Sequence, residues 1–311
     1  MSKRSSHMYC RCSLAAIAVF LISQFAMAQE VKTTTLLLDH VSICGASLDA
    51  LRQIFRDAGM AADVLGPQAD GTTQAAMLGF DDGTYIELVA PMKPGAAEGS
   101  GWAKFMTDED VPCAWTVGTN SLQEEVDRLK QAGIAVTAPA RGNRKRADGM
   151  SLEWTTADVG STTPGAVLPS IIEDQTPRAW RAPASASLQG APVTGVANVV
   201  LGVNNLEAAI ALLHKAYGWS GPLIENQRDF GKVAYFPGEP VILAAPTGGG
   251  WLADRIAKYG ESPVAYLLNA RDFAAAVKKY KLSGGKTWFG QKVAWFDLDK
   301  LKGYRVGVIG E

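Results

Sequence analysis

The sequence predicts an α+β fold built from four copies of one module, in which a strand and a helix are followed by three further strands. Three observations predict it: one apolar strand pattern recurs four times, a segment with helical periodicity follows each recurrence, and β-rich runs separate the helices. The 311 residues, 47% of them hydrophobic and 20% charged, suffice for two domains of roughly 100–200 residues each.

The first strand of each module is an apolar run. These runs lie at residues 36–43, 111–117, 196–201 and 263–268. Ser47 and Ser121 follow the first two runs and are predicted N-caps, and Ser121 with Glu124 has the spacing of a capping box. Apolar residues then recur at helical spacing, so each helix has one apolar stripe that can pack on a sheet.

The two halves of the chain share landmarks in the same order. Phe80, Ala90-Pro91, Gly101-Trp102, Pro112 and Ala114-Trp115 recur as Phe236, Ala245-Pro246, Gly250-Trp251, Pro263 and Ala265-Tyr266. A stretch rich in Ala, Pro and Ser separates the halves. We therefore expect a first domain at residues 32–178, a linker at residues 179–193 and a second domain at residues 194–311.

The N-terminus has the pattern of a secretory signal peptide. Lys3, Arg4 and Arg11 precede a short apolar run that ends in Ala26-Met27-Ala28. We expect cleavage after Ala28, which makes residues 1–28 a signal peptide and the mature protein periplasmic or secreted. The run is too short and interrupted for a stable membrane span, and an uncleaved anchor is the alternative.

Charge and cysteine content narrow the class of protein. The 30 basic and 31 acidic residues leave no basic excess for nucleic acid, so a nucleic-acid partner is not expected. Removal of the signal peptide leaves Cys44 and Cys113. They could pair in an oxidising compartment, but their apolar surroundings favour buried free thiols.

The fourfold strand and helix order resembles the vicinal oxygen chelate superfamily, in which paired βαβββ modules form a cupped sheet around a metal site. The first domain resembles the glyoxalase-like branch. The residues that carry the resemblance are Leu38-Asp39-His40-Val41, Gly83 to Pro91, Arg146-Ala147-Asp148-Gly149, Leu152, Trp154, Leu168-Pro169 and Ile172-Glu173. The resemblance implies two cupped mixed-sheet domains. For the second domain it is architectural only.

The family places metal ligands on the first and last strands of its modules. Carried onto this chain, the ligands are His40, Glu87 and Glu173, with Ala114 at the fourth position. One imidazole and two carboxylates suit a divalent Mn, Fe, Ni, Zn or Mg ion and leave coordination positions open for substrate. The alternative is that His40 is a hydrogen-bonded core residue and that the glutamates face water.

The second domain lacks these ligand types. Asn198 stands at the His40 position and Ile242 at the Glu87 position. We therefore expect this domain to be free of metal, and to pack against the first or form a lid or interface.

Two further groups are candidate substrate-binding residues. Arg144 and Arg146 could bind a carboxylate of the substrate, because a guanidinium offers a planar two-donor fork. Trp115 and Trp154 could form an aromatic wall. The alternatives are a solvated loop for the arginines and core packing for the tryptophans.

The resemblance implies an exported, metal-dependent lyase or isomerase of glyoxalase-like type. The metal would polarise a carbonyl of a small oxygen-rich substrate and stabilise an enolate, with Glu173, or else Glu87, as the catalytic base. Expected partners are the small-molecule substrate and a second copy of the chain in a homodimer. The alternative function is a non-catalytic protein that binds or sequesters a small molecule. Ring-cleaving dioxygenase chemistry is disfavoured by Ala114.

Overall fold

The sixteen strands in the described part of the chain form two sheets of eight strands each. The computed structural model describes residues 36–68, 71–146, 148–160, 163–283, 285–297, 301 and 305–310. The predicted signal peptide and its cleavage site lie outside the described residues. Both sheets belong to one compact unit, residues 32–311.

The first sheet has the strand order β2-β3-β4-β1-β5-β8-β7-β6. Its strands are β1 (Leu37–Cys44), β2 (Asp63–Pro67), β3 (Thr73–Gly79), β4 (Tyr85–Pro91), β5 (Val111–Gly118), β6 (Ala140–Lys145), β7 (Ser151–Asp158) and β8 (Ser170–Asp174). Its helices are α1 (Leu48–Asp57), the 3-10 helix η1 (Ala103–Phe105), α2 (Leu122–Gln131) and α3 (Arg178–Arg181).

The second sheet repeats this order as β10-β11-β12-β9-β13-β16-β15-β14. Its strands are β9 (Val193–Gly202), β10 (Leu223–Gln227), β11 (Gly231–Tyr235), β12 (Val241–Ala245), β13 (Ser262–Ala270), β14 (Lys286–Trp288), β15 (Gln291–Trp295) and β16 (Arg305–Gly310). Its helices are α4 (Leu206–Tyr217), α5 (Trp251–Tyr259) and α6 (Phe273–Tyr280).

Both sheets have the same internal pairing, as the predicted duplication requires. The first strands of two modules run antiparallel at the centre, and each pairs in parallel with the last strand of its own module. The register aligns Ser42 with Glu87 in the first sheet and Val200 with Ile242 in the second. The predicted α+β fold of four modules in two mixed sheets is therefore confirmed.

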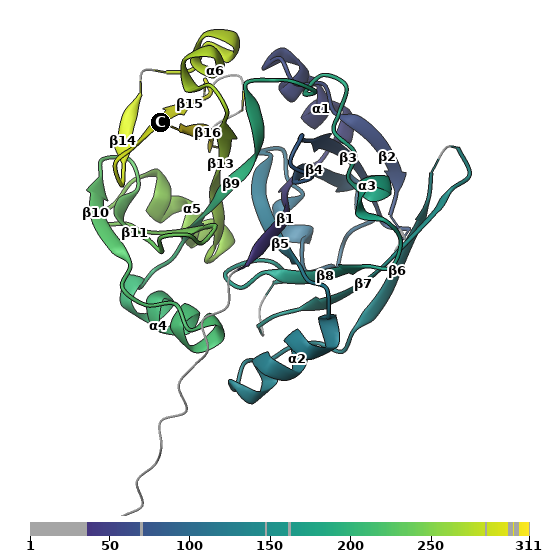
Figure 1. Cartoon of the computed structure of the whole chain (residues 1–311), viewed down its shortest axis with the longest axis horizontal. Coiled ribbons are helices and arrows are strands. Elements are labelled where there is room, and N and C mark those ends of the chain that lie inside the picture. The colour runs from purple at the N-terminus through teal and green to yellow at the C-terminus, as the bar shows by residue number, and fades with distance from the viewer. Residues whose placement is uncertain are drawn as a thin grey trace, which may run out of the picture. The chain divides into compact units, whose positions relative to one another are not determined.

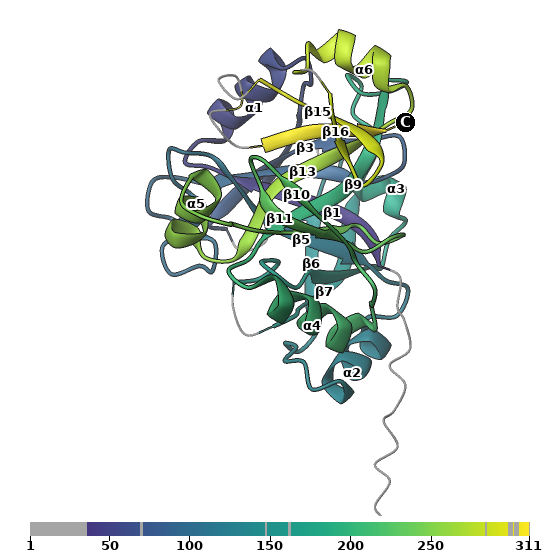
Figure 2. The same cartoon turned by 90° about the vertical axis from the view of Figure 1, so that its left-hand side faces the viewer.

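The two sheets meet through their central strands. β5 contacts β13 in the middle of the molecule, where Figure 1 shows β1, β5, β9 and β13 side by side. The Tyr266 hydroxyl donates to the carbonyl oxygens of Ser42 and Ala114, at 2.7 and 2.9 Å. In both views α1 lies near α6 and α2 near α4, so the helices gather in two pairs at opposite ends (Figures 1 and 2).

The two predicted N-cap residues, Ser47 and Ser121, lie directly before α1 and α2. The Ser47 hydroxyl caps α1 by accepting from the amide of Ala50. Ser121 occupies the N-cap position of α2, but its side chain makes no capping hydrogen bond, so the predicted capping box is not formed. Gly218 ends α4 in the left-handed conformation, as a C-terminal glycine allows. None of the helices in the described part of the chain is long and apolar enough to span a membrane.

The segment that joins the two sheets lies along the first domain. Ser185 and Gly79 are joined by two hydrogen bonds of 3.0 Å, one from each backbone amide. A Cβ atom on Gly79 would come within 2.1 Å of the Pro183 carbonyl oxygen, so only glycine permits this approach. The predicted linker thus contributes directly to the surroundings of the first sheet.

Cys44 and Cys113 form a disulfide, which corrects the expectation of free thiols. Cys44 ends β1 and Cys113 lies on β5, with their Cα atoms 5.8 Å apart. Because β1 and β5 pair antiparallel with an irregular register at this end, the two side chains come close enough to bond. The apolar surroundings that suggested free thiols enclose the bridge instead.

Candidate functional site

His40 lies on β1, in the centre of the first sheet, with its ring stacked on Tyr85 of β4. The ring centroids are 4.6 Å apart and the planes differ by 13°. The Nδ1 atom of His40 lies 2.6 Å from Oδ1 of Asp39, a carboxylate with no solvent exposure. The imidazole is therefore held both by the ring below it and by a buried carboxylate.

Burial keeps the imidazole neutral. Desolvation lowers the pKa of His40 to about 4, although the negative charge of Glu87 opposes this shift. Two arginines pair with Asp39, so its carboxylate can only accept a hydrogen bond. Nδ1 must then carry the ring proton, and the lone pair of Nε2 is free to bind a ligand. A carboxylate that orients a histidine in this way is typical of metal-binding histidines.

Glu87 on β4 is the acidic residue that faces His40. Its Oε2 atom lies 4.0 Å from His40 Nε2, and its Oε1 accepts a 3.2 Å hydrogen bond from Gln68. The distance of 4.0 Å exceeds a hydrogen bond but is shorter than two metal–ligand bonds of about 2.1 Å each. His40 and Glu87 therefore fit a divalent ion between them.

The structure does not bring Glu173 to this pair. Glu173 lies on the helix-covered side of β8, where its Oε2 accepts a 2.9 Å hydrogen bond from the amide of Leu122. Leu122 is the first residue of α2, so Glu173 satisfies the helix N-terminus that Ser121 leaves uncapped. No group of three or more His, Cys, Asp or Glu side chains placed to hold a metal occurs among the described residues.

The neighbouring residue Asp174 faces the His40 side of the sheet. Successive strand residues point to opposite faces, which separates Asp174 from Glu173. Its carboxylate accepts hydrogen bonds of 2.5 and 2.8 Å from Arg181. Asp174 is therefore near His40 but is already paired with an arginine.

Two arginines from α3 complete the polar network, and the sequence analysis did not predict them. Arg181, only 4% exposed, donates to both oxygens of Asp39 and to the Tyr85 hydroxyl at 2.8 Å. Arg178 also donates to the Asp39 carboxylate. An acidic residue inside the apolar run 36–43 was the available signal, because a buried carboxylate requires a paired cation.

A cavity of about 540 Å³ opens beside this network, between β2, β6 and the segment after α3. Arg144, Arg146 and Arg181 line it, together with Met77, which is paired with Glu87 across β3 and β4. Arg146 pairs with Asp148 at 2.9 Å, whereas Arg144 makes no ion pair within the part of the chain that is described. Burial lowers the pKa of Arg144. The two predicted arginines thus share one cavity that adjoins Glu87.

The two predicted tryptophans lie on opposite faces of the sheet. Trp115 is fully buried in the main hydrophobic core, and its indole donates to the carbonyl oxygen of Ala166 at 3.2 Å. It therefore packs in the core, in agreement with the alternative interpretation. Trp154 is half-buried and pairs with Asp174 across β7 and β8, so it lies on the His40 side.

The fold and the paired modules define a protein of the vicinal oxygen chelate class. The model of one family, described as the glyoxalase-like domain, matches residues 38–217, more than half of the chain. The chain belongs to this glyoxalase-like domain family. No curated protein matches the chain.

Solved structures share the fold at low sequence identity. A hypothetical protein from Staphylococcus aureus is 13% identical with a TM-score of 0.58, and the match covers 88% of this chain and 98% of that one. A mutant 4-hydroxymandelate synthase from Streptomyces coelicolor is 11% identical, with a TM-score of 0.60 and coverage of 88% and 92%. The Mn(II)-bound glyoxalase from Novosphingobium aromaticivorans is 12% identical, with a TM-score of 0.53 and coverage of 89% and 82%.

Proposed function

We propose that this protein is an exported, metal-dependent lyase or isomerase that acts on a small substrate carrying a carbonyl or hydroxyl group beside a carboxylate. The observation that carries the proposal is the His40–Glu87 pair, 4.0 Å apart, next to a cavity lined by arginines. His40 and Glu87 would hold the divalent ion. A bound divalent ion would supply Lewis-acid polarisation of the substrate carbonyl and stabilise negative charge on its oxygen.

The protein's own residues supply binding and proton transfer. Arg144, which has no paired carboxylate among the described residues, would bind the substrate carboxylate from the cavity side. Glu87 would accept the proton from the carbon next to the carbonyl, because the carboxylate of Glu173 is occupied at the start of α2. The base that the sequence analysis preferred is therefore replaced here by its alternative.

Asp39 and Tyr85 would keep the imidazole in place during this reaction. Asp39 holds the proton on Nδ1, and the Tyr85 ring covers one face of His40. Burial raises the pKa of Tyr85 to about 12, so its hydroxyl stays protonated while it accepts from Arg181. Both residues fix the direction of the Nε2 lone pair.

Two features support export. The predicted signal peptide has the expected charge and apolar pattern. The Cys44–Cys113 disulfide is of the kind that persists in an oxidising compartment. A test is N-terminal sequencing of the protein from fractionated cells, with Gln29 expected as the first residue.

The test of the site is metal analysis of the mature protein after exposure to Mn²⁺, Fe²⁺, Ni²⁺ and Zn²⁺. We expect one bound ion in the wild type, loss of that ion in His40→Ala and Glu87→Gln, and retention in Glu173→Gln, the matched control. Exchange of the carbon-bound proton of 2-oxo and 2-hydroxy carboxylates in D₂O then reports on catalysis. Unchanged metal content in His40→Ala and Glu87→Gln would contradict the site.

The second candidate function is non-catalytic binding of a small anion. The placement of Glu173 favours it, because the structure joins only two of the three predicted ligands. In this case the 2-oxo and 2-hydroxy carboxylates would bind without metal and without exchange of their carbon-bound proton. Arg144→Gln would weaken the binding of these compounds.

A further inference from the structure

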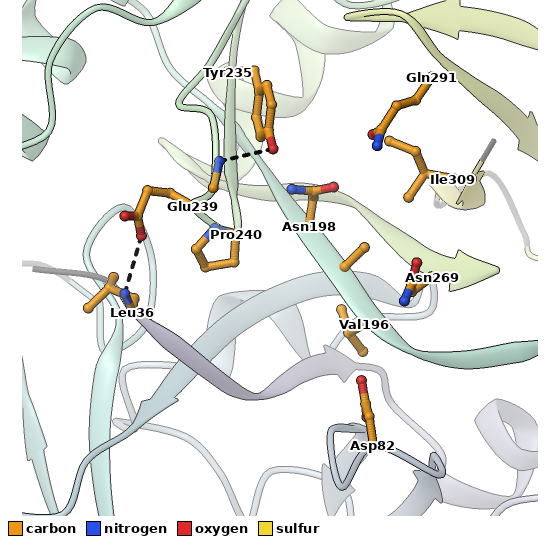
Figure 3. Close-up of a pocket in the computed structure, with 13 residues that line it drawn as sticks. Leu36, Asp82, Val196, Asn198, Tyr235, Glu239, Pro240, Asn269, Gln291 and Ile309 are labelled. Carbon is orange, nitrogen blue, oxygen red and sulfur yellow. Dashed lines mark hydrogen bonds between the residues drawn. The ribbon is translucent and has the colours of Figure 1, made fainter. Parts of the chain in front are cut away.

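A second cavity, of about 320 Å³, lies in the second sheet, on the side that corresponds to the His40 face of the first. Figure 3 shows its lining residues, which come from β9, β11, β13, β15, β16 and the loop before β12, with Leu36 and Asp82 from the first domain. Its volume is within the range of small-molecule sites. It is separate from the arginine-lined cavity beside Glu87, with which it shares no lining residue.

Asn198 lies at the centre of this cavity, at the position that His40 occupies in the first sheet. Its side chain is 7% exposed, and Figure 3 shows its amide in the open space between Tyr235 and Ile309. Figure 3 marks no hydrogen bond between this amide and the other lining residues. The two donors and the acceptor of Asn198 open into the cavity and are suited to a bound polar molecule.

The other polar groups around Asn198 also combine donors with acceptors. Asn269 and Gln291 contribute two further amides. The Tyr235 hydroxyl accepts from the amide of Gly238 at 3.3 Å and so keeps its proton for donation. A hydroxyl group on a ligand is likewise both a donor and an acceptor, so amides and phenols complement it.

The charges of the cavity exclude an anionic ligand. Asp82 and Glu239 are the charged residues among those that line it, and neither Lys nor Arg is among them. Both carboxylates are engaged within the protein: Asp82 accepts from Thr84, and Glu239 accepts from the amide of Leu36 at 3.2 Å. Each carboxylate has two oxygens and several acceptor positions, so both residues can still accept hydrogen bonds from hydroxyl groups of a neutral ligand.

An apolar cluster fills another part of the second sheet. Phe230, Trp288 and Trp295 pack together with centroids 4.9 to 5.7 Å apart, and Ile242, at the Glu87 position, belongs to the same cluster. None of these four residues lines the cavity, whose volume of about 320 Å³ suits one small ring.

We propose that the second domain binds a neutral, hydroxyl-rich small molecule the size of a monosaccharide, through Asn198, Asn269 and Gln291. This inference goes beyond the proposed function, since it concerns the other domain and a ligand of different charge.

The test is ligand-observed NMR of the mature protein with neutral hexoses and myo-inositol, followed by calorimetry. We expect saturable binding of at least one of them. Asn198→Leu, which removes the amide at similar volume, should weaken the binding about tenfold or more, because it leaves hydroxyl groups of the ligand without their hydrogen-bond partner. Gln291→Ala, at an exposed position that folding tolerates, should weaken it about threefold or more.

The control is His40→Ala, which should lose the metal and bind the same sugar with unchanged affinity. A failure of the proposed metal site can therefore be distinguished from a failure of the proposed sugar site. Absence of saturable binding by every hexose and by inositol would overturn the inference. Unchanged affinity in both Asn198→Leu and Gln291→Ala would do so as well. Binding of protonated amines in place of sugars would show that the two carboxylates, rather than the amides, select the ligand.

Discussion

Arg181 of α3 and Asp39 of β1 form a buried ion pair with two contacts, Nη1 to Oδ1 at 3.1 Å and Nη2 to Oδ2 at 2.8 Å. Asp39 in turn holds Nδ1 of His40. A residue beyond the last strand of the first domain therefore determines the orientation of an imidazole on its first strand. The predictions below test this connection and its consequences.

Arg181→Met should destabilise the protein by about 3–5 kcal/mol, because it removes the buried cation from Asp39 and Asp174 and leaves them only the part-exposed Arg178. Urea unfolding, monitored by circular dichroism, measures this loss of stability. The matched control is Arg178→Met, at a side chain 36% exposed, which should cost clearly less. Equal effects in the two variants would show that Arg181 has no special role in the network.

Asp39→Asn should weaken metal binding about 10–100-fold, because the orienting carboxylate of a metal-bound histidine is removed. Calorimetric titration with Mn²⁺ or Zn²⁺ measures the affinity. Glu173→Gln makes the same change of carboxylate to amide at a partly buried residue of the same sheet and should leave the affinity unchanged. A loss of affinity in Glu173→Gln equal to that in Asp39→Asn would refute this assignment.

Metal-free protein should lose stability as the pH falls from about 6.5 to about 4. The pKa of His40 is lowered to about 4 in the folded state, whereas the unfolded chain titrates near 6.5. In this window the unfolded state binds the additional proton, so acid favours unfolding, by about 3 kcal/mol in total from this group. Glu87 and Asp174 oppose the shift and Arg181 reinforces it.

Urea midpoints between pH 7 and pH 4 measure this dependence. His40→Gln, which does not titrate, should show a shallower decrease over the same range. Parallel curves for the wild type and His40→Gln would contradict the lowered pKa.

Replacement of Cys44 and Cys113 by alanine should reduce the free energy of unfolding by about 2–4 kcal/mol. The bridge joins residues that are 69 positions apart in the sequence, and it restricts the unfolded chain by closing the loop between them. Thermal unfolding with and without reductant measures it. Reductant should lower the midpoint temperature of thermal unfolding of the wild type and leave that of the double variant unchanged. A wild type with two titratable thiols would show that the bridge is absent.

Much of the fold could be predicted from periodicity. The apolar stripes of the helices and the recurrence of one strand pattern determined the four modules, and Ser47 and Gly218 marked helix ends by local backbone chemistry. His40 and Glu87 were indicated by the resemblance to the glyoxalase-like branch, which places metal ligands on the first and last strands of its modules. These signals are local, and the chain carries them in its residue order.

The different roles of two adjacent acidic residues could not be predicted from periodicity. Glu173 and Asp174 point to opposite faces of β8, and a shift of one residue in register exchanges their roles. The sequence by itself determined that this strand carries carboxylates. Only the pairing of β8 with β5 and β7, together with the uncapped start of α2, decided that Glu173 stabilises a helix while Asp174 faces His40.

The same distinction holds for the chain as a whole. Sequence alone determined the modules and the two domains, because periodicity and repetition are properties of residue order, and the resemblance to the glyoxalase-like branch indicated His40 and Glu87 as candidate ligands. Tertiary structure decided the disulfide and the arginine network, which joins Asp39 to Arg181 across 142 positions of sequence. Contacts between residues so distant depend on how the strands pack, which no local pattern records.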